Sequence, residues 1–223
     1  MDAGTPPRAI AKRATVLVAD DHPILLEGVR RLLETEYDIV ATAADGRELV
    51  AATLRLSPDI VLMDIGMPLL NGIEAARLIK RNAPQVKIVF LTQQSHRSYV
   101  QEAFRAGAAG YVLKQSAATE LIRSLREVLQ SRYYVSPVIA GADLTARLDP
   151  NKNPSDLFGG ALTPRQREVL QLIAEGKAAK EIAGIVGISV KTVEFHKAAI
   201  MEELGLRTTA ELTRYALQHG IIA

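Results

Sequence analysis

The sequence contains no cysteine and no tryptophan, and only four phenylalanines among its 223 residues. The absence of cysteine excludes disulfides, thiolate metal sites and cysteine nucleophiles, and it fits the reducing cytoplasm. No apolar run approaches the ~20 residues that a membrane-spanning helix needs, and residues 1–13 lack the apolar segment of a signal peptide. We therefore expect a cytoplasmic protein without a membrane partner, with an aliphatic core behind a flexible leader at residues 1–13.

The overall charge of the protein excludes few kinds of binding partner. The net charge is only +2, and residues 161–223 contain nearly equal numbers of basic and acidic side chains. A strongly basic domain would point to nucleic acid through its charge alone. Here a nucleic-acid interpretation must depend on where the charges lie, because no excess of them is present.

Residues 14–130 alternate short apolar runs with amphipathic stretches. The runs are continuous and rich in β-branched residues, which is typical of strands buried on both faces. Amphipathic stretches near residues 23–34, 46–56, 72–82, 97–106 and 118–130 predict helices between them. The pattern predicts an α/β domain with a doubly wound, five-stranded parallel sheet. The apolar runs are Thr15–Asp20, Asp38–Ala43, Asp59–Asp64, Val86–Thr92 and Gly110–Lys114.

The rest of the chain lacks this alternation and contains other local signals. Residues 131–160 are rich in proline and glycine and predict a linker, in which a short helix is expected around residues 138–147. Residues 161–223 predict a small all-helical domain with helices near residues 164–175, 179–186, 189–204 and 208–218. Thr163 with Gln166, and Thr208 with Glu211, form capping-box patterns. Short helices separated by glycines favour a helix-turn-helix with supporting helices.

Polar residues stand at the carboxyl ends of four predicted strands. Asp20 and Asp21 end the first strand, Asp64 the third, Thr92 the fourth and Lys114 the fifth. Each has a structural explanation by itself: adjacent aspartates can cap a helix, and a lone lysine or threonine usually serves the surface or a turn. Because the carboxyl ends of strands in an open parallel sheet converge on one crevice, their coincidence favours a shared site.

The chemistry of such a crevice is restricted. Three carboxylates repel each other, so they need a cation or a proton, and oxygen ligands of this kind suit Mg²⁺. Asp64 can act as a nucleophile toward phosphorus. Mg²⁺ and the Lys114 ammonium can offset the charge on the phosphoryl oxygens, and the Thr92 hydroxyl can donate a hydrogen bond to the new phosphoryl group.

Residues 14–130 resemble the receiver domains of bacterial response regulators. The motifs that carry the resemblance are VADDHP at 18–23, LMDIGMPLLNG at 62–72, the threonine at 92 and GYVLK at 110–114. The resemblance implies a flavodoxin-like fold with Asp64 as the phosphoacceptor. It implies a Mg²⁺ site of Asp21, Asp64 and the main-chain carbonyl of Gly66, with Asp20 supporting the metal through water. The implied phosphate contacts are Thr92 and Lys114.

The resemblance also gives roles to residues near these motifs. Tyr111 matches a switch aromatic that turns inward when the hydroxyl moves; without the resemblance it would be interpreted as an aromatic at the rim of the last strand. Two positions depart from the family. Gly66 stands where a larger residue is common, and Gln93 and Gln94 follow the hydroxyl where a small residue is more usual. These positions flank the route of water to the acyl phosphate, so they bear on its lifetime.

The C-terminal segment resembles the DNA-binding domains of the LuxR, NarL and FixJ type, from Ala161 to about Ile222. The matching pieces are LTPRQREVL, KEIA and ISVKTVEFHKAAIMEELG. The helix after Ser189 is expected to enter the major groove of double-stranded DNA. Helical spacing places Val190, Val193, Ile200 and Leu204 on its packed face. The candidate DNA-binding residues are Lys191, Thr192, Glu194, Phe195, His196, Lys197 and Ala198.

The candidate DNA contacts differ in chemistry. Lys191, Thr192 and Lys197 suit phosphates or bases. Glu194 can accept a hydrogen bond from a cytosine amino group, and Phe195 can touch a thymine methyl. Glu194 also brings negative charge where some relatives carry lysine, which weakens non-specific binding.

Two further positions have a structural interpretation. His196 suits packing or a phosphate contact rather than a metal, because no second ligand lies nearby in the sequence. Ala178 and Ala179 replace a polar cap before KEIA, which predicts slight fraying of that helix. On pattern alone, a charged amphipathic helix is more often a solvated surface helix, but the capping signals around this one favour DNA binding.

Together these parts predict a response regulator transcription factor that catalyses only its own phosphorylation and dephosphorylation. We expect a partner histidine kinase to phosphorylate Asp64, which changes dimerisation and sequence-specific DNA binding, with a homodimer as the phosphorylated form. In family members of this type the unphosphorylated receiver can cover the recognition helix.

Three alternatives stay open at this point. The first is a DNA-binding protein that uses its receiver only as a dimerisation scaffold. The second is a small α/β phosphotransferase or phosphatase, although the sequence has no glycine-rich phosphate loop. The third is a receiver with an RNA-binding or protein-binding output.

Overall fold

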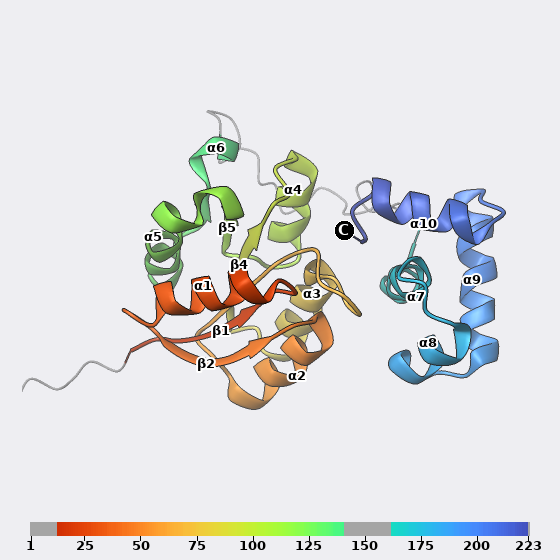
Figure 1. The fold of residues 1–223 in the computed structure, drawn as a ribbon, viewed down its shortest axis with the longest axis horizontal. Coiled ribbons are helices and arrows are strands. Elements are labelled where there is room, and N and C mark those ends of the chain that lie inside the picture. The colour runs from red at the N-terminus through yellow and green to blue at the C-terminus, as the bar shows by residue number, and fades with distance from the viewer. Residues whose placement is uncertain (1–12, 141–161, 223) are drawn as a thin grey trace, which may run out of the picture.

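The computed structural model describes residues 13–140 and 162–222. Within them the chain forms two domains: a parallel sheet between two layers of helices, and a group of four helices (Figure 1). The predicted fold class is confirmed. Apart from Arg13, the predicted leader lies outside the described residues, and so does the predicted linker from residue 141 onward.

The first domain is built on a sheet with the strand order β2-β1-β3-β4-β5-β6. Every neighbouring pair is parallel. The order reverses between β1 and β3, so the crevice at a topological switch point opens at the carboxyl ends of these two strands. The strands are β1 (Thr15–Ala19), β2 (Asp38–Ala43), β3 (Ile60–Met63), β4 (Lys87–Thr92), β5 (Gly110–Leu113) and β6 (Tyr134–Val135).

The sheet differs from the prediction at both edges. A sixth strand, β6, lies in the predicted linker, where Tyr134 N donates to Ala109 O at 3.0 Å and Ser136 N to Tyr111 O at 2.9 Å. Two residues carry too little periodicity to predict a strand from sequence. At the other edge, β2 alternates exposed residues with half-buried ones up to the buried Ala43, instead of being buried on both faces.

Two layers of helices cover the sheet. Alternate strand residues face opposite layers: Val16 and Val18 pack toward α1 and α5, whereas Leu17 and Ala19 pack toward α2, α3 and α4. These helices occupy the stretches that the sequence predicts. They are α1 (Pro23–Leu33), α2 (Gly46–Leu56), α3 (Gly72–Asn82), α4 (Arg97–Arg105) and α5 (Ala117–Leu129), followed by the short α6 (Pro137–Ala140).

The second domain consists of α7 (Pro164–Ala174), α8 (Ala179–Val186), α9 (Val190–Leu204) and α10 (Thr209–Gln218). The two predicted capping boxes are present, with Thr163 accepting from Gln166 N and Thr208 from Glu211 N. Ser189 caps α9 by accepting from Thr192 N at 3.1 Å. At Ala178 only half a box forms, since alanine has no oxygen to offer and only the Glu181 carboxylate accepts from Ala178 N.

The packed face of α9 is narrower than the sequence predicts. Val193 and Ile200 are buried and Leu204 is half-buried, but Val190 is 44% exposed. The prediction for Val190 is therefore wrong. It lies in the first turn of α9, whereas the buried Val193 and Ile200 lie further along the helix, which packs against α7 and α8.

In the described part of the chain, α7 and the turn after α10 contact the first domain. Figure 1 shows α7 between the receiver-like sheet domain and α9, so α9 lies on the side away from the sheet. The turn after α10 reaches the first domain: a Cβ added at Gly220 would lie 1.5 Å from the hydroxyl of Tyr99. The expected cover over the recognition helix is thus absent from the described part of this structure.

Gly72 opens α3 at a position where the loop after β3 folds back on the strand. A Cβ at Gly72 would lie 2.1 Å from the main-chain oxygen of Asp64. We expect Gly72→Ala to lower the free energy of unfolding by about 1–3 kcal/mol, since rigid backbone must move. The measurement is urea denaturation of the full chain.

The matched control is Gly28→Ala in α1, where an added Cβ meets nothing within 4 Å. That variant should be stabilised by up to about 1 kcal/mol, because alanine favours a helix interior over glycine. Equal stability of the two variants would contradict this account of the loop.

Candidate functional site

The sheet brings the predicted site residues to one edge. Asp20 and Asp21 follow β1, Asp64 follows β3, Thr92 is the last residue of β4 and Lys114 follows β5. These four strands are consecutive neighbours in the sheet. Their carboxyl ends therefore lie side by side, at the crevice that the topology creates.

The ammonium group of Lys114 joins two of the carboxylates. Its Nζ lies 2.6 Å from Asp64 Oδ2 and 2.8 Å from Asp20 Oδ2. Both aspartates are buried, with exposed fractions of 7% for Asp64 and 4% for Asp20. Two buried carboxylates would repel each other strongly without a shared cation, so Lys114 is the residue that makes their proximity possible.

The pKa of Lys114 reflects a competition. Burial acts to lower it, because a low-dielectric environment disfavours the charged ammonium. Hydrogen bonds from the ammonium to Asp20 and Asp64, and the charges of these carboxylates, act in the opposite direction and prevail, so the pKa lies above its usual value. Lys114 is therefore a permanent positive charge in the crevice.

Asp21 and His22 extend the site toward solvent. His22 Nδ1 lies 2.8 Å from Asp21 Oδ1 and 3.1 Å from Asp20 Oδ1. One ligand atom from each of Asp20, Asp21 and His22 lies within 4.8 Å of the others, which is close enough to hold a metal ion. Carboxylate oxygens are the ligands that Mg²⁺ prefers, so Asp20 and Asp21 fit the predicted metal, whereas the His22 nitrogen does not and Asp64 is not part of this group. His22 was not among the predicted site residues.

Thr92 and Tyr111 are linked through Gln94. Thr92 is buried and its Oγ1 accepts a hydrogen bond from Gln94 N at 3.3 Å. The Tyr111 hydroxyl donates to the main-chain oxygen of Gln94 at 2.7 Å. The side chain of Tyr111 is fully buried, which contradicts its interpretation as a rim aromatic. Burial, followed by the charge of Asp64, raises the pKa of Tyr111, so the hydroxyl stays a donor.

The remaining predicted positions lie around this site. Gly66 belongs to the loop between β3 and α3, two residues after Asp64, and is partly exposed. Gln93 is exposed and Gln94 is half-buried. The role of Gly66 as a metal ligand and the effect of the glutamines on phosphate lifetime stay predictions.

The exposed members of the candidate DNA contacts recur at helical spacing and share one face of α9. Among the described residues, Phe195 is a large apolar side chain that is 69% exposed on this helix. Its ring meets that of His196 edge-on, with centroids 6.0 Å apart. The exposed members of the set are Lys191, Glu194, Phe195 and Ala198, and the partly exposed members are Thr192, His196 and Lys197.

Comparison with known proteins agrees with both halves of this description. The family described as "Response regulator receiver domain" matches residues 16–126, and "Bacterial regulatory proteins, luxR family" matches residues 160–216. The transcriptional regulatory protein MctR of Rhizobium johnstonii is 36% identical over 210 residues, which cover 93% of this chain and 95% of that protein. The chain is a response regulator with a LuxR-type DNA-binding domain.

Other relatives share the whole architecture. The oxygen regulatory protein NreC of Staphylococcus aureus is 36% identical over 93% of this response regulator and 98% of its own length. A solved structure of the Salmonella typhimurium response regulator RcsB is similar with a TM-score of 0.63 and 28% identity, covering 93% of this chain and 98% of that one. The RcsB structure bound to promoter rprA with a phosphomimetic has a TM-score of 0.59 and 30% identity over 92% and 98% of the two chains.

Two features of this response regulator had no sequence signal or only a weak one. His22 stands in the VADDHP motif, but histidine there also suits the turn before Pro23. Gln171 interrupts the apolar run of α7 and is only 1% exposed, a pattern that could have marked it as a contact. None of the helices in residues 13–140 and 162–222 is long and apolar enough to cross a bilayer.

Removal of the Lys114 charge should destabilise the receiver domain. We expect Lys114→Met to lower the free energy of unfolding by about 2 kcal/mol or more, because loss of one partner leaves buried charge uncompensated. Added Mg²⁺ should restore part of the loss by supplying positive charge to the same carboxylates. Thermal denaturation with and without Mg²⁺ measures both effects.

The control is Lys180→Met, which removes an exposed lysine of α8. Its stability should stay close to that of the wild type, and Mg²⁺ should change the stability of both proteins by the same amount. If Lys114→Met were as stable as this control without Mg²⁺, the ammonium would not be holding the crevice together.

Proposed function

We propose that this response regulator is phosphorylated on Asp64 by a partner histidine kinase, and that phosphorylation controls dimerisation and sequence-specific DNA binding. The observation that carries the proposal is the contact of Asp64 with Lys114 at 2.6 Å inside an acidic crevice. A carboxylate beside a fixed cation suits nucleophilic attack on phosphorus. The same chain contains a DNA-binding domain whose activity can respond to this phosphorylation.

The phosphoryl transfer needs little from the protein beyond positioning and charge. An oxygen of Asp64 forms a bond to phosphorus while the bond from phosphorus to the donor nitrogen of the kinase histidine breaks. Lys114 stays charged and faces the phosphoryl oxygens. Asp20, Asp21, Asp64 and the carbonyl of Gly66 would hold Mg²⁺, which supplies further positive charge when bound.

The signal would pass through Thr92 and Tyr111. The Thr92 hydroxyl accepts from Gln94 N and still has a proton to donate to the phosphoryl group, so its movement toward that group would pull on Gln94. Because Tyr111 holds the neighbouring carbonyl of the same Gln94, a shift of this residue changes the packing of Tyr111. The affected surface consists of α4, β5 and α5, and changed packing there alters which surface is available for a second copy.

DNA binding is proposed for the exposed face of α9. The accessible Lys191, Glu194 and Phe195 provide a cation, an acceptor and an apolar contact on one face, which suits the major groove. The similarity to RcsB, which has been solved on promoter DNA with a phosphomimetic, supports the same output here. Two copies would read paired half-sites.

The phosphoacceptor can be tested by intact-mass measurement of the full chain after treatment with acetyl phosphate and Mg²⁺. The wild type should gain one phosphoryl group, and Asp64→Asn should gain none, because an amide is not a nucleophile toward phosphorus. Asp38→Asn, which alters an exposed aspartate of β2, is the matched control and should behave as the wild type. Equal modification of Asp64→Asn would place the acceptor elsewhere.

The same samples separate this proposal from a receiver that serves only as a scaffold. Phosphorylated wild type should form more dimer in sedimentation and bind duplex DNA more tightly than the untreated protein. If phosphorylation occurs but leaves both properties unchanged, the scaffold interpretation is favoured and phosphorylation is not the switch.

The DNA surface can be tested with duplex sites selected by the wild type from a random pool. Lys191→Ala should weaken binding, and if Lys191 contacts a phosphate the slope of log affinity against log salt should fall by about 0.9. Arg55→Ala, which removes an exposed cation of the receiver, should leave affinity and slope unchanged. An unaltered affinity in Lys191→Ala would exclude this residue from the interface.

A further inference from the structure

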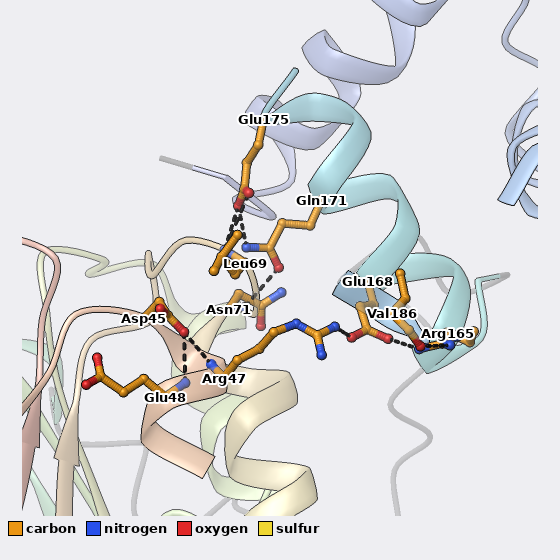
Figure 2. Close-up of polar contacts among 10 residues, drawn as sticks. All are labelled: Asp45, Arg47, Glu48, Leu69, Asn71, Arg165, Glu168, Gln171, Glu175 and Val186. Carbon is orange, nitrogen blue, oxygen red and sulfur yellow. Dashed lines mark hydrogen bonds and ion pairs between the residues drawn. The ribbon is translucent and has the colours of Figure 1, made fainter. Parts of the chain in front are cut away.

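The α7 helix of the DNA-binding domain holds the loop that follows the phosphoacceptor. This loop, residues 65–71, begins directly after Asp64 and connects β3 to α3. Figure 2 shows Gln171 of α7 and Glu175, the residue that caps the C-terminus of α7, extending toward the main chain of this loop. They lie one turn apart on the helix, so both reach the same target.

Gln171 makes two hydrogen bonds across the domain boundary. Its Nε2 donates to the main-chain oxygen of Met67 at 3.0 Å, and its Oε1 accepts from Asn71 N at 2.9 Å. The side chain is 1% exposed. A buried amide whose donor and acceptor are both satisfied by one loop is specific for the conformation of that loop.

Glu175 adds a third contact. Its Oε1 accepts from Leu69 N at 3.1 Å and from Gln171 Nε2 at 2.8 Å. Leu69 has a φ of 63°, in the left-handed region that a leucine rarely adopts. Burial raises the pKa of Glu175 despite these hydrogen bonds, because a buried environment disfavours the charged carboxylate.

Ion pairs flank these contacts on both sides. Arg167 of α7 pairs with Glu74 of α3 through Nε and Oε1 at 2.7 Å. Glu168 of α7 pairs with Arg47 of α2 and also with Arg165. The apolar cluster beneath α2, α3 and α4 continues into the core of the second domain. The loop is therefore the centre of a packed interface, with charges at its border.

The held loop is continuous with the reacting carboxylate. Ile65 N donates to Asp64 Oδ1 at 2.6 Å, while Lys114 occupies Asp64 Oδ2. The carbonyl of Ile65 in turn accepts from Met67 N and Gly72 N, at 3.0 and 2.9 Å. Both oxygens of Asp64 are thus engaged, one of them by the loop that α7 holds.

We propose that Gln171 and Glu175 are positioning residues for the reaction at Asp64: in the docked arrangement they fix loop 65–71 in the form that engages the carboxylate, so that docking of α7 and occupation of the phosphoryl site oppose each other. This inference rests on the proposed phosphorylation of Asp64. Two sites that bias one element in opposite directions are coupled, and the coupling is reciprocal.

The inference differs from a covered recognition helix. Because α9 lies away from the receiver, docking does not block its DNA-binding face. Docking instead fixes the orientation of the second domain, and with it the positions from which two copies could reach paired half-sites. Release of α7 from loop 65–71 frees that orientation.

The test is the affinity of the full chain for beryllofluoride, a phosphoryl mimic, measured by calorimetry in the presence of Mg²⁺. Gln171→Ala, a change in the other domain, should bind beryllofluoride roughly fivefold more tightly or better, the lower end of usual coupling between sites. Glu175→Ala should shift the affinity in the same direction. Gln85→Ala, at an exposed glutamine of the receiver, is the control and should match the wild type.

A conservative variant distinguishes positioning from general damage. Glu175→Gln keeps an oxygen that can accept from Leu69 N without a buried charge, so its affinity for beryllofluoride should stay near that of the wild type. Reciprocally, beryllofluoride should accelerate amide hydrogen exchange at Leu69 and Asn71 in the wild type, because their acceptors leave with α7.

The outcomes separate the two proposals. If the wild type binds beryllofluoride and Gln171→Ala and Glu175→Ala bind it equally well, the positioning role is overturned while the proposed function stands. If the wild type binds none, and acetyl phosphate also leaves Asp64 unmodified, the proposed function is overturned and this inference with it. Should Gln171→Ala fail to fold, Glu175→Ala and the exchange rates of the wild type decide the matter.

Discussion

The contact of one ammonium group with two buried carboxylates is the interaction on which the site depends. Lys114 lies within 2.8 Å of Asp20 and 2.6 Å of Asp64, and the burial of all three groups makes each charge depend on the others. The parallel sheet provides this proximity, since the residues follow three different strands. A cation shared in this way also marks the place where phosphoryl oxygens would find positive charge, which connects stability with the proposed chemistry.

Much of the fold follows from local patterns. Continuous apolar runs gave the central strands, and the side chains of Thr163, Ser189 and Thr208 fixed the starts of three helices, because a cap depends on neighbours in the sequence. The candidate site was also predictable, since the topology of an open parallel sheet brings strand ends together. Pattern alone could name Asp64 and Lys114, while their distances and burial had to come from the structure.

The features that escaped prediction are set by tertiary contacts. Val190 satisfies the helical period of α9, yet it is exposed in the structure, and β6 is too short for any periodicity. Leu69, with its left-handed backbone, donates to Glu175, and Asn71 donates to Gln171, so these contacts join residues at least 100 positions apart in the chain. The interface also places α9 on the side away from the sheet, which differs from the cover expected from the family and is why we propose control through α7 and loop 65–71.

The most direct measurement is a crystal structure of the full chain with Mg²⁺ and beryllofluoride. The account predicts beryllium bonded to an oxygen of Asp64, the metal among Asp20, Asp21 and Asp64, and the Lys114 ammonium on a fluoride in place of its present contact with Asp64. Beryllofluoride bound at another residue, or a metal outside this group of carboxylates, would contradict the account.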